Sequence, residues 1–162
     1  MKNIGSAAVE DARELTRRLR LLHGGVSARE LARILGVEIS KASWRVAGGK
    51  IIYFAECSIS PPKIVLNIDA IELAARSGAC FGKWECLWFT PEQIAEVVIA
   101  HELYHILTRQ SSSPEVESAA HEFARRYTGV PFSLSRYDAA LKQAGKEQIS
   151  SSSTSSHHIS SF

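Results

Sequence analysis

The chain has 162 residues, 45% of them hydrophobic and 22% charged, and a formal net charge of +2. This composition is typical of one folded domain, and it argues against intrinsic disorder, against a protein that coats a polyanion and against an acidic tail. We expect a single minimal domain over residues 1–149 and a disordered tail over residues 150–162, where eight of 13 residues are serine.

Two further features indicate where the protein resides. No apolar run has the length of a signal peptide, and none approaches the roughly 20 residues that cross a bilayer. The three cysteines, Cys57, Cys80 and Cys86, form no CxxC pair, which argues against a disulfide framework. We therefore predict a cytoplasmic protein with no membrane partner, whereas the oligomeric state has no signature in the sequence.

The first predicted elements are two helices. Apolar residues recur at helical spacing over residues 8–22, and two glycines follow them, as is typical of a helix end. Ser27 and Glu30 form a capping-box signature at the start of a second, short helix over residues 28–35, which Gly36 ends.

The middle of the chain predicts a small, mostly antiparallel sheet. Short extended pieces over residues 37–46 precede a turn at Gly48-Gly49 and a strand over residues 50–57. Another strand covers residues 63–67, and a helix over residues 69–76 follows it.

The last third of the chain predicts helices. Thr90 as a cap and Pro91 at the first helical position start a helix that is apolar on all sides, which indicates a buried, central position. Ser113 starts the next helix and Gly129 ends it, and a short helix begins at Ser135. The predicted fold class is α+β, with a small sheet packed on helices.

His101, Glu102 and His105 form an HExxH motif inside the buried helix. Residues four apart lie on one helix face, so both imidazoles can bind one zinc ion while Glu102 lies beside the open metal position. Chance alone would give the motif about 0.02 times in such a chain. The alternative is a pair of core histidines, each of which would need its own buried partner, because an unsatisfied polar group costs about 1–3 kcal/mol.

A catalytic zinc ion takes three protein ligands and leaves one position to water. On the helix after the motif, Glu117 borders the buried side, and His121 lies one turn later on the same edge. We favour Glu117 as the third ligand and place His121 beside the site. Two alternatives are His121 as the ligand itself and Glu117 as a solvated surface charge.

HELYH is followed, 12 residues after its second histidine, by ESAAHEFA, and this pair of motifs resembles the ImmA/IrrE-type zinc metallopeptidases. In that family HExxH pairs with a glutamate on the next helix. The upstream order LARILGVEI, KIVLN and FTPEQ is also similar, and the resemblance covers roughly residues 7–132. Tyr104, His121 and residues 125–128 depart from the family's usual pattern.

The resemblance implies a zincin-like fold with a buried HExxH helix, with His101, His105 and Glu117 as zinc ligands and Glu102 as the catalytic glutamate. The implied activity is that of a zinc-dependent metallo-endopeptidase, in which zinc-activated water attacks the peptide bond and Glu102 is the general base. Family members often act on regulatory proteins, so the expected partner is a protein or peptide substrate such as a transcriptional repressor.

Further residues are candidates for contact with the substrate. His121 and Tyr127 are possible donors to the transition state, as are Tyr137 and Arg125. By analogy with the family, the strand over residues 63–67 is expected to be the edge that receives an extended peptide. Its central residues are Ile64, Val65 and Leu66.

Three alternatives compete with an active peptidase. Residues 27–46 resemble the start of a helix-turn-helix, but the second helix would be short and the basic excess of a DNA-binding domain is missing, so nucleic acid is not the expected partner. A catalytically degenerate metallopeptidase fold used for binding or regulation is favoured if Tyr104 fills the cleft. A latent enzyme would have Cys80 or Cys86 at the open zinc position.

Overall fold

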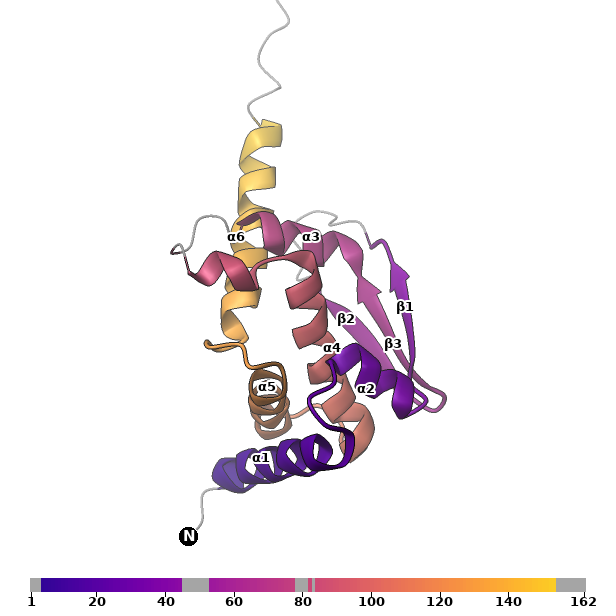
Figure 1. Ribbon diagram of the computed structural model, residues 1–162. Coiled ribbons are helices and arrows are strands. Elements are labelled where there is room, and N and C mark those ends of the chain that lie inside the picture. Colours follow the sequence, from indigo (N-terminus) through magenta and orange to yellow (C-terminus); the bar gives the residue numbers. More distant parts are fainter. Residues whose placement is uncertain (1–3, 45–52, 78–81, 83, 154–162) are drawn as a thin grey trace, which may run out of the picture.

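The computed structural model describes residues 4–44, 53–77, 82 and 84–153, and it shows an α+β protein in which helices surround one side of a small sheet (Figure 1). The elements in chain order are α1 (Ile4–His23), α2 (Ala28–Ile34), β1 (Glu38–Ala42), β2 (Ala55–Ile59), β3 (Pro62–Asn67), α3 (Ile68–Ser77), the 3-10 helix η2 (Glu85–Trp88), α4 (Pro91–Thr108), α5 (Pro114–Thr128) and α6 (Ser135–Ser153).

The sheet has the order β1-β3-β2 and is mixed, which corrects the prediction of a mostly antiparallel sheet. β2 and β3 are consecutive and joined by a tight turn, so they pair antiparallel. β1 pairs parallel with the other side of β3, and 12 residues separate its end from the start of β2 in the sequence.

The strand order also overturns the predicted substrate edge. Ile64, Val65 and Leu66 pair with β1 on one side and with β2 on the other, so β3 is the central strand and its backbone is already occupied. Within the described residues, β2 forms an outer edge of the sheet, and it packs against α4.

The alternative of a helix-turn-helix is wrong. α2 is present and begins at the predicted cap, where the Ser27 hydroxyl accepts a hydrogen bond from the Glu30 amide. The chain then turns at Gly36, whose φ of 71° lies in the left-handed region, and enters β1. A strand therefore occupies residues 38–42, where a recognition helix would have begun.

α4 is the central helix, as predicted from its apolar residues. The Thr90 hydroxyl accepts a hydrogen bond from the Gln93 amide at 3.2 Å, and Pro91 is the first helical residue. α4 packs against α2, α3, α5 and the sheet, so that even residues on opposite faces, such as Val97 and Ile99, are fully buried. This packing fixes the motif helix between the sheet on one side and α5 on the other.

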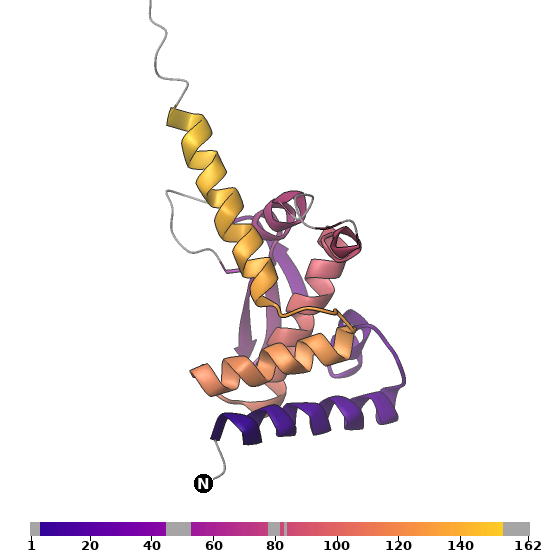
Figure 2. The ribbon, with the colours of Figure 1, turned by 90° about the vertical axis from the view of Figure 1, so that its left-hand side faces the viewer.

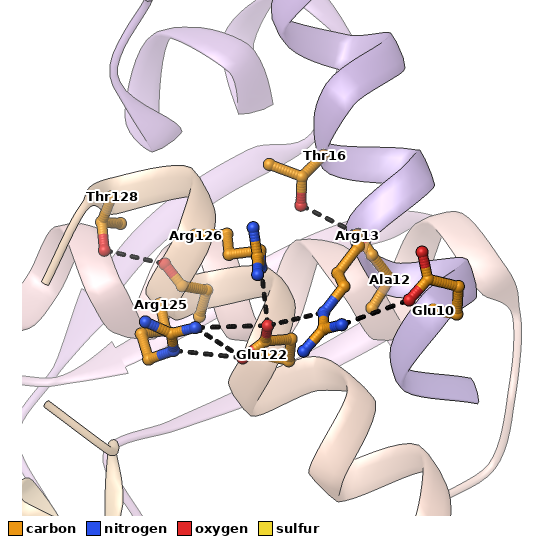
Figure 3. A network of polar contacts seen from close by, with 9 residues as sticks. Glu10, Ala12, Arg13, Thr16, Glu122, Arg125, Arg126 and Thr128 are labelled. Carbon is orange, nitrogen blue, oxygen red and sulfur yellow. Dashed lines mark hydrogen bonds and ion pairs between the residues drawn. The ribbon is translucent and has the colours of Figure 1, made fainter. Parts of the chain in front are cut away.

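α1 lies along α5 (Figure 2), and a network of charged side chains joins the two helices (Figure 3). The Glu122 carboxylate accepts hydrogen bonds from Arg13 of α1 at 3.0 Å, from Arg125 at 3.1 and 3.2 Å, and from Arg126 at 2.6 Å. Burial raises the pKa of Glu122, but the three guanidinium groups outweigh burial and lower it to about 2.

This shift gives an expected pH dependence of stability. Because the pKa of Glu122 is lower in the folded state than its ordinary value of 4.5, its contribution is complete above that value and is lost as the pH falls towards 2. Glu122→Gln should therefore flatten the acid limb of the unfolding free energy by up to about 1.4 kcal/mol per pH unit. Urea unfolding between pH 6 and pH 3 measures this slope. The exposed Glu72→Gln should keep the slope of the wild type, and an unchanged slope in Glu122→Gln would refute the assignment.

The last helix is longer than the predicted short helix. α6 extends to Ser153, so four residues of the expected serine-rich tail are helical, and its first half packs against α3. The rest of that tail lies outside the described residues, as do the predicted turn at Gly48-Gly49 and Cys80. No described helix combines the length and the apolar character needed to span a membrane.

Candidate metal centre

The packing of α4 on α5 brings the three predicted ligands together. His101 and His105 lie one turn apart on α4, and Glu117 faces them from the first turn of α5. The Nε2 atoms of the two histidines are 3.2 Å apart, and the Glu117 carboxylate oxygens lie 3.3 Å from His101 Nε2 and 3.4 Å from His105 Nε2. These three residues form a group that could hold a metal ion.

The spacing of these atoms fits a tetrahedral ion. Ligand atoms about 2.0–2.1 Å from a tetrahedral zinc ion are separated from each other by about 3.3 Å. The two Nε2 atoms are 3.2 Å apart, which is close to this value, and each lies 3.3–3.4 Å from a different oxygen of the Glu117 carboxylate. One atom from each of the three residues lies within 4.8 Å of the others, so the group could hold one ion. Two imidazoles and one carboxylate are also a donor set found at catalytic zinc sites.

Two features of the His105 ring suit a metal ligand: its lowered pKa and its hydrogen bond to the backbone of Gln110. Burial lowers its pKa, and the proximity of His101 acts in the same direction, so the imidazole is neutral at pH 7 and has a lone pair to offer. The ring also hydrogen-bonds to the backbone of Gln110, and because this bond favours the protonated ring, the ring is the donor. Such a second hydrogen bond holds the tautomer and the orientation of a metal-binding histidine.

His101 has no comparable partner. Its Nδ1 atom is buried and makes no hydrogen bond to any residue in the described part of the chain. A buried polar group without a partner costs about 1–3 kcal/mol. A metal ion bound at Nε2 would leave Nδ1 unchanged, so among the described residues His101 lacks the second hydrogen bond that orients His105.

Glu117 is held as a carboxylate by its neighbours. Hydrogen bonding with His101 lowers its pKa, the Ser112 hydroxyl acts in the same way, and together they outweigh burial and bring the pKa to about 2. Ser112 donates its hydrogen bond to Oε1 at 2.6 Å. Ser112 was not among the predicted site residues, because it is one of three consecutive serines before α5 and no motif distinguishes it from the other two.

Glu102 lies beside the three ligands and contacts β2. Burial raises its pKa, the charge of Glu117 adds to this effect, and His101 and a hydrogen bond with Cys57 oppose it. Burial also raises the pKa of Cys57 to about 12, so the thiol is protonated and donates to the Glu102 carboxylate. Cys57 is a second residue that the sequence analysis missed, since it comes from a distant strand and belongs to no motif.

A cavity of about 280 Å³ lies over this group. Its walls include His101, Glu102 and Glu117, with Ala55 of β2 on one side and Tyr137 of α6 on the other.

Tyr104 does not fill the cavity. Its side chain is absent from the cavity wall and is buried against α5, where its ring lies 5.6 Å from the ring of Phe123, centroid to centroid. The condition that would favour a degenerate, binding-only fold is therefore not met.

The predicted transition-state donors differ in whether they line the cavity and in whether their donor groups already have partners. His121 lines the cavity, its ring centroid is 5.0 Å from that of His101, and burial lowers its pKa. Tyr127 does not line the cavity, because its hydroxyl donates to the Val26 carbonyl beneath α1. Tyr137 lines the cavity, but its hydroxyl donates to the Trp88 carbonyl at 2.7 Å.

Comparisons of the chain with models of protein families, with curated protein sequences and with solved structures find no match.

Proposed function

We propose that the chain is a zinc-dependent metallo-endopeptidase whose centre is formed by His101, His105, Glu117 and Glu102. The observation that carries this proposal is the meeting of two imidazoles and a carboxylate: the two Nε2 atoms are 3.2 Å apart, each lies 3.3–3.4 Å from one oxygen of Glu117, and the half-buried Glu102 lines the same cavity as His101 and Glu117. The resemblance of the two motifs to the ImmA/IrrE-type peptidases supports the same activity and a cytoplasmic location.

The donor set supports zinc as the metal. Zinc binds imidazole nitrogen and carboxylate oxygen in tetrahedral sites, and three protein ligands leave one position open for chemistry. A zinc ion bound here would polarise the scissile carbonyl group and acidify the attacking water.

Glu102 is the general base in this proposal. It follows His101 in the sequence and lies in the wall of the cavity, where burial makes its carboxylate more basic than an exposed one. Glu102 takes a proton from the attacking water and later delivers it to the leaving amine. The Cys57 thiol donates a hydrogen bond to the Glu102 carboxylate, and this bond orients the carboxylate before the substrate binds.

His121 is the group best placed to donate to the oxygen of the scissile carbonyl. It lines the same cavity as the ligands but does not belong to the group of three that meets at one point. A hydrogen-bond donor at this place stabilises the negative charge that develops on the oxygen in the transition state.

β2 is the strand proposed to receive the substrate. It is an outer edge of the sheet within the described residues, Ala55 lies in the cavity wall, and Cys57 contacts Glu102. A peptide that pairs with the free edge of β2 is held extended beside the catalytic glutamate. The substrate in this proposal is a protein or peptide, and a transcriptional repressor is the kind of target that the family resemblance implies.

The test is metal-dependent proteolysis. The protein loaded with zinc should cleave an unfolded protein such as reduced casein, lose this activity on dialysis against 1,10-phenanthroline, and regain it when one equivalent of zinc is added. Cleavage that survives complete removal of the metal would refute the mechanism. Absence of cleavage of any unfolded protein by the zinc-loaded form would refute the activity.

A further inference from the structure

We propose that a second cavity, reached past His121, binds an acidic side chain of the peptide substrate through Arg125. This inference rests on the proposed peptidase function and names a feature of its substrate. Three observations carry it: the spacing of residues on α5, the wall residues that the two cavities share, and the hydrogen bonds of Arg125.

One face of α5 connects the metal centre to Arg125. Glu117, His121 and Arg125 are four residues apart, so they follow each other along one side of the helix. With a rise of 1.5 Å per residue, the backbone of Arg125 lies about 12 Å along α5 from that of Glu117. An extended peptide covers this distance in about three or four residues.

The two cavities share part of their walls. His121 and Leu134 line both the cavity over the metal centre and a second one of about 450 Å³. The second cavity continues along α5 to Arg125, with Phe132 as an apolar wall. The two cavities therefore adjoin at His121 and Leu134, and in this proposal a substrate that lies over Glu102 extends past His121 into the second cavity.

Arg125 and Glu122 are the charged side chains in the wall of the second cavity, and Arg13 and Arg126 bind Glu122 from outside that wall. Arg125 donates to Glu122 through Nε and Nη2, and Nη1 makes no hydrogen bond to the described residues. The negative charge of Glu122 is offset by Arg13 and Arg126, which also donate hydrogen bonds to its carboxylate (Figure 3). Three arginines share the carboxylates of Glu122 and Glu10, which leaves one excess positive charge in this network.

The ligand that fits is a carboxylate. A guanidinium edge with an unused donor forms charge-assisted hydrogen bonds to aspartate or glutamate, and these are stronger than bonds between neutral groups. We therefore expect the peptidase to prefer peptides with an acidic residue three or four positions from the scissile bond, on the side that passes His121.

The experiment uses the zinc-loaded full chain and a peptide that it cleaves, acetylated and amidated so that only side chains carry charge. Positions up to four residues on each side of the cleaved bond are changed in turn to glutamate, glutamine or lysine, and kcat/KM is measured for each. At one position glutamate should be preferred over glutamine by about tenfold, and lysine should be the poorest.

Two arginine variants make the test specific. Arg125→Gln should cleave the glutamate and glutamine peptides equally well, and Arg125→Glu should favour lysine. Arg126→Gln also loses one hydrogen bond to Glu122, but Arg126 lines neither cavity, so it should keep the preference of the wild type.

The outcomes separate the two proposals. A wild-type enzyme that cleaves the peptides without any preference for glutamate refutes the acidic subsite and leaves the peptidase standing. The same holds if Arg125→Glu, with an unchanged zinc content, keeps the wild-type preference. If no peptide or unfolded protein is cleaved by the zinc-loaded chain, the proposed function itself fails.

Discussion

Glu102→Gln should reduce kcat for peptide hydrolysis by about 10² to 10⁴-fold and leave one zinc ion bound per chain. The amide of glutamine has nearly the shape of the carboxylate but cannot accept the proton of the attacking water. Glu102 does not belong to the group of three ligands, so the metal affinity should change little. Metal analysis by mass spectrometry and kinetics on the same preparation measure both properties.

The matched control is Glu96→Gln on the same helix. Glu96 forms an ion pair with Arg29 of α2 at 3.6 Å and lines neither cavity, so its replacement tests the loss of a carboxylate from α4 without touching the site. This variant should keep the activity of the wild type. A Glu102→Gln enzyme that hydrolyses peptides at the rate of Glu96→Gln would show that another group is the base.

Glu117→Gln should weaken zinc binding by at least about 100-fold, because it removes the charged member of the ligand set. Ser112→Ala, which removes only the hydrogen bond to that carboxylate, should weaken binding by about tenfold. Competition with a chelating dye measures both affinities. The order of the effects tests whether Ser112 acts through Glu117.

The control for these variants is Glu115→Gln, two residues earlier on α5. Glu115 accepts a hydrogen bond from Ser113 and does not belong to the ligand group, so zinc affinity should stay at the wild-type value. If Glu117→Gln binds zinc as tightly as Glu115→Gln, the carboxylate is not a ligand, and His121 becomes the next candidate.

The three residues that could hold a metal ion were predictable because their positions depend on local relations within each helix. A spacing of four residues places His101 and His105 on one face whatever the rest of the fold does, and the cap residues Thr90 and Ser113 fix where α4 and α5 begin. The amphipathic phase of α5 was sufficient to place Glu117 on the side that faces α4.

The order of the strands was not predictable in the same way. Alternation and turn residues identify a strand but not its neighbours, which depend on pairings between distant segments. The expected edge at Val65 was wrong for this reason, because β1 reaches across and pairs with the free side of β3. Family analogy supplied an edge strand beside the motif helix, and the structure places β2 there.

Contacts between side chains of different elements were also not predictable from the sequence. Cys57 reaches Glu102 only because β2 packs on α4, and Tyr104 turns away from the cavity only because Phe123 of α5 offers it a packing partner. Tyr127 was one of the candidate donors to the transition state, but its hydroxyl donates to the Val26 carbonyl in the chain between α1 and α2.

The most direct test of the metal centre is a crystal structure of the zinc-loaded protein with diffraction data collected on both sides of the zinc absorption edge. The anomalous difference map should show one strong peak about 2.0–2.1 Å from His101 Nε2, from His105 Nε2 and from a carboxylate oxygen of Glu117. A map with no peak among these three residues, or with zinc bound only at other residues, would contradict the account.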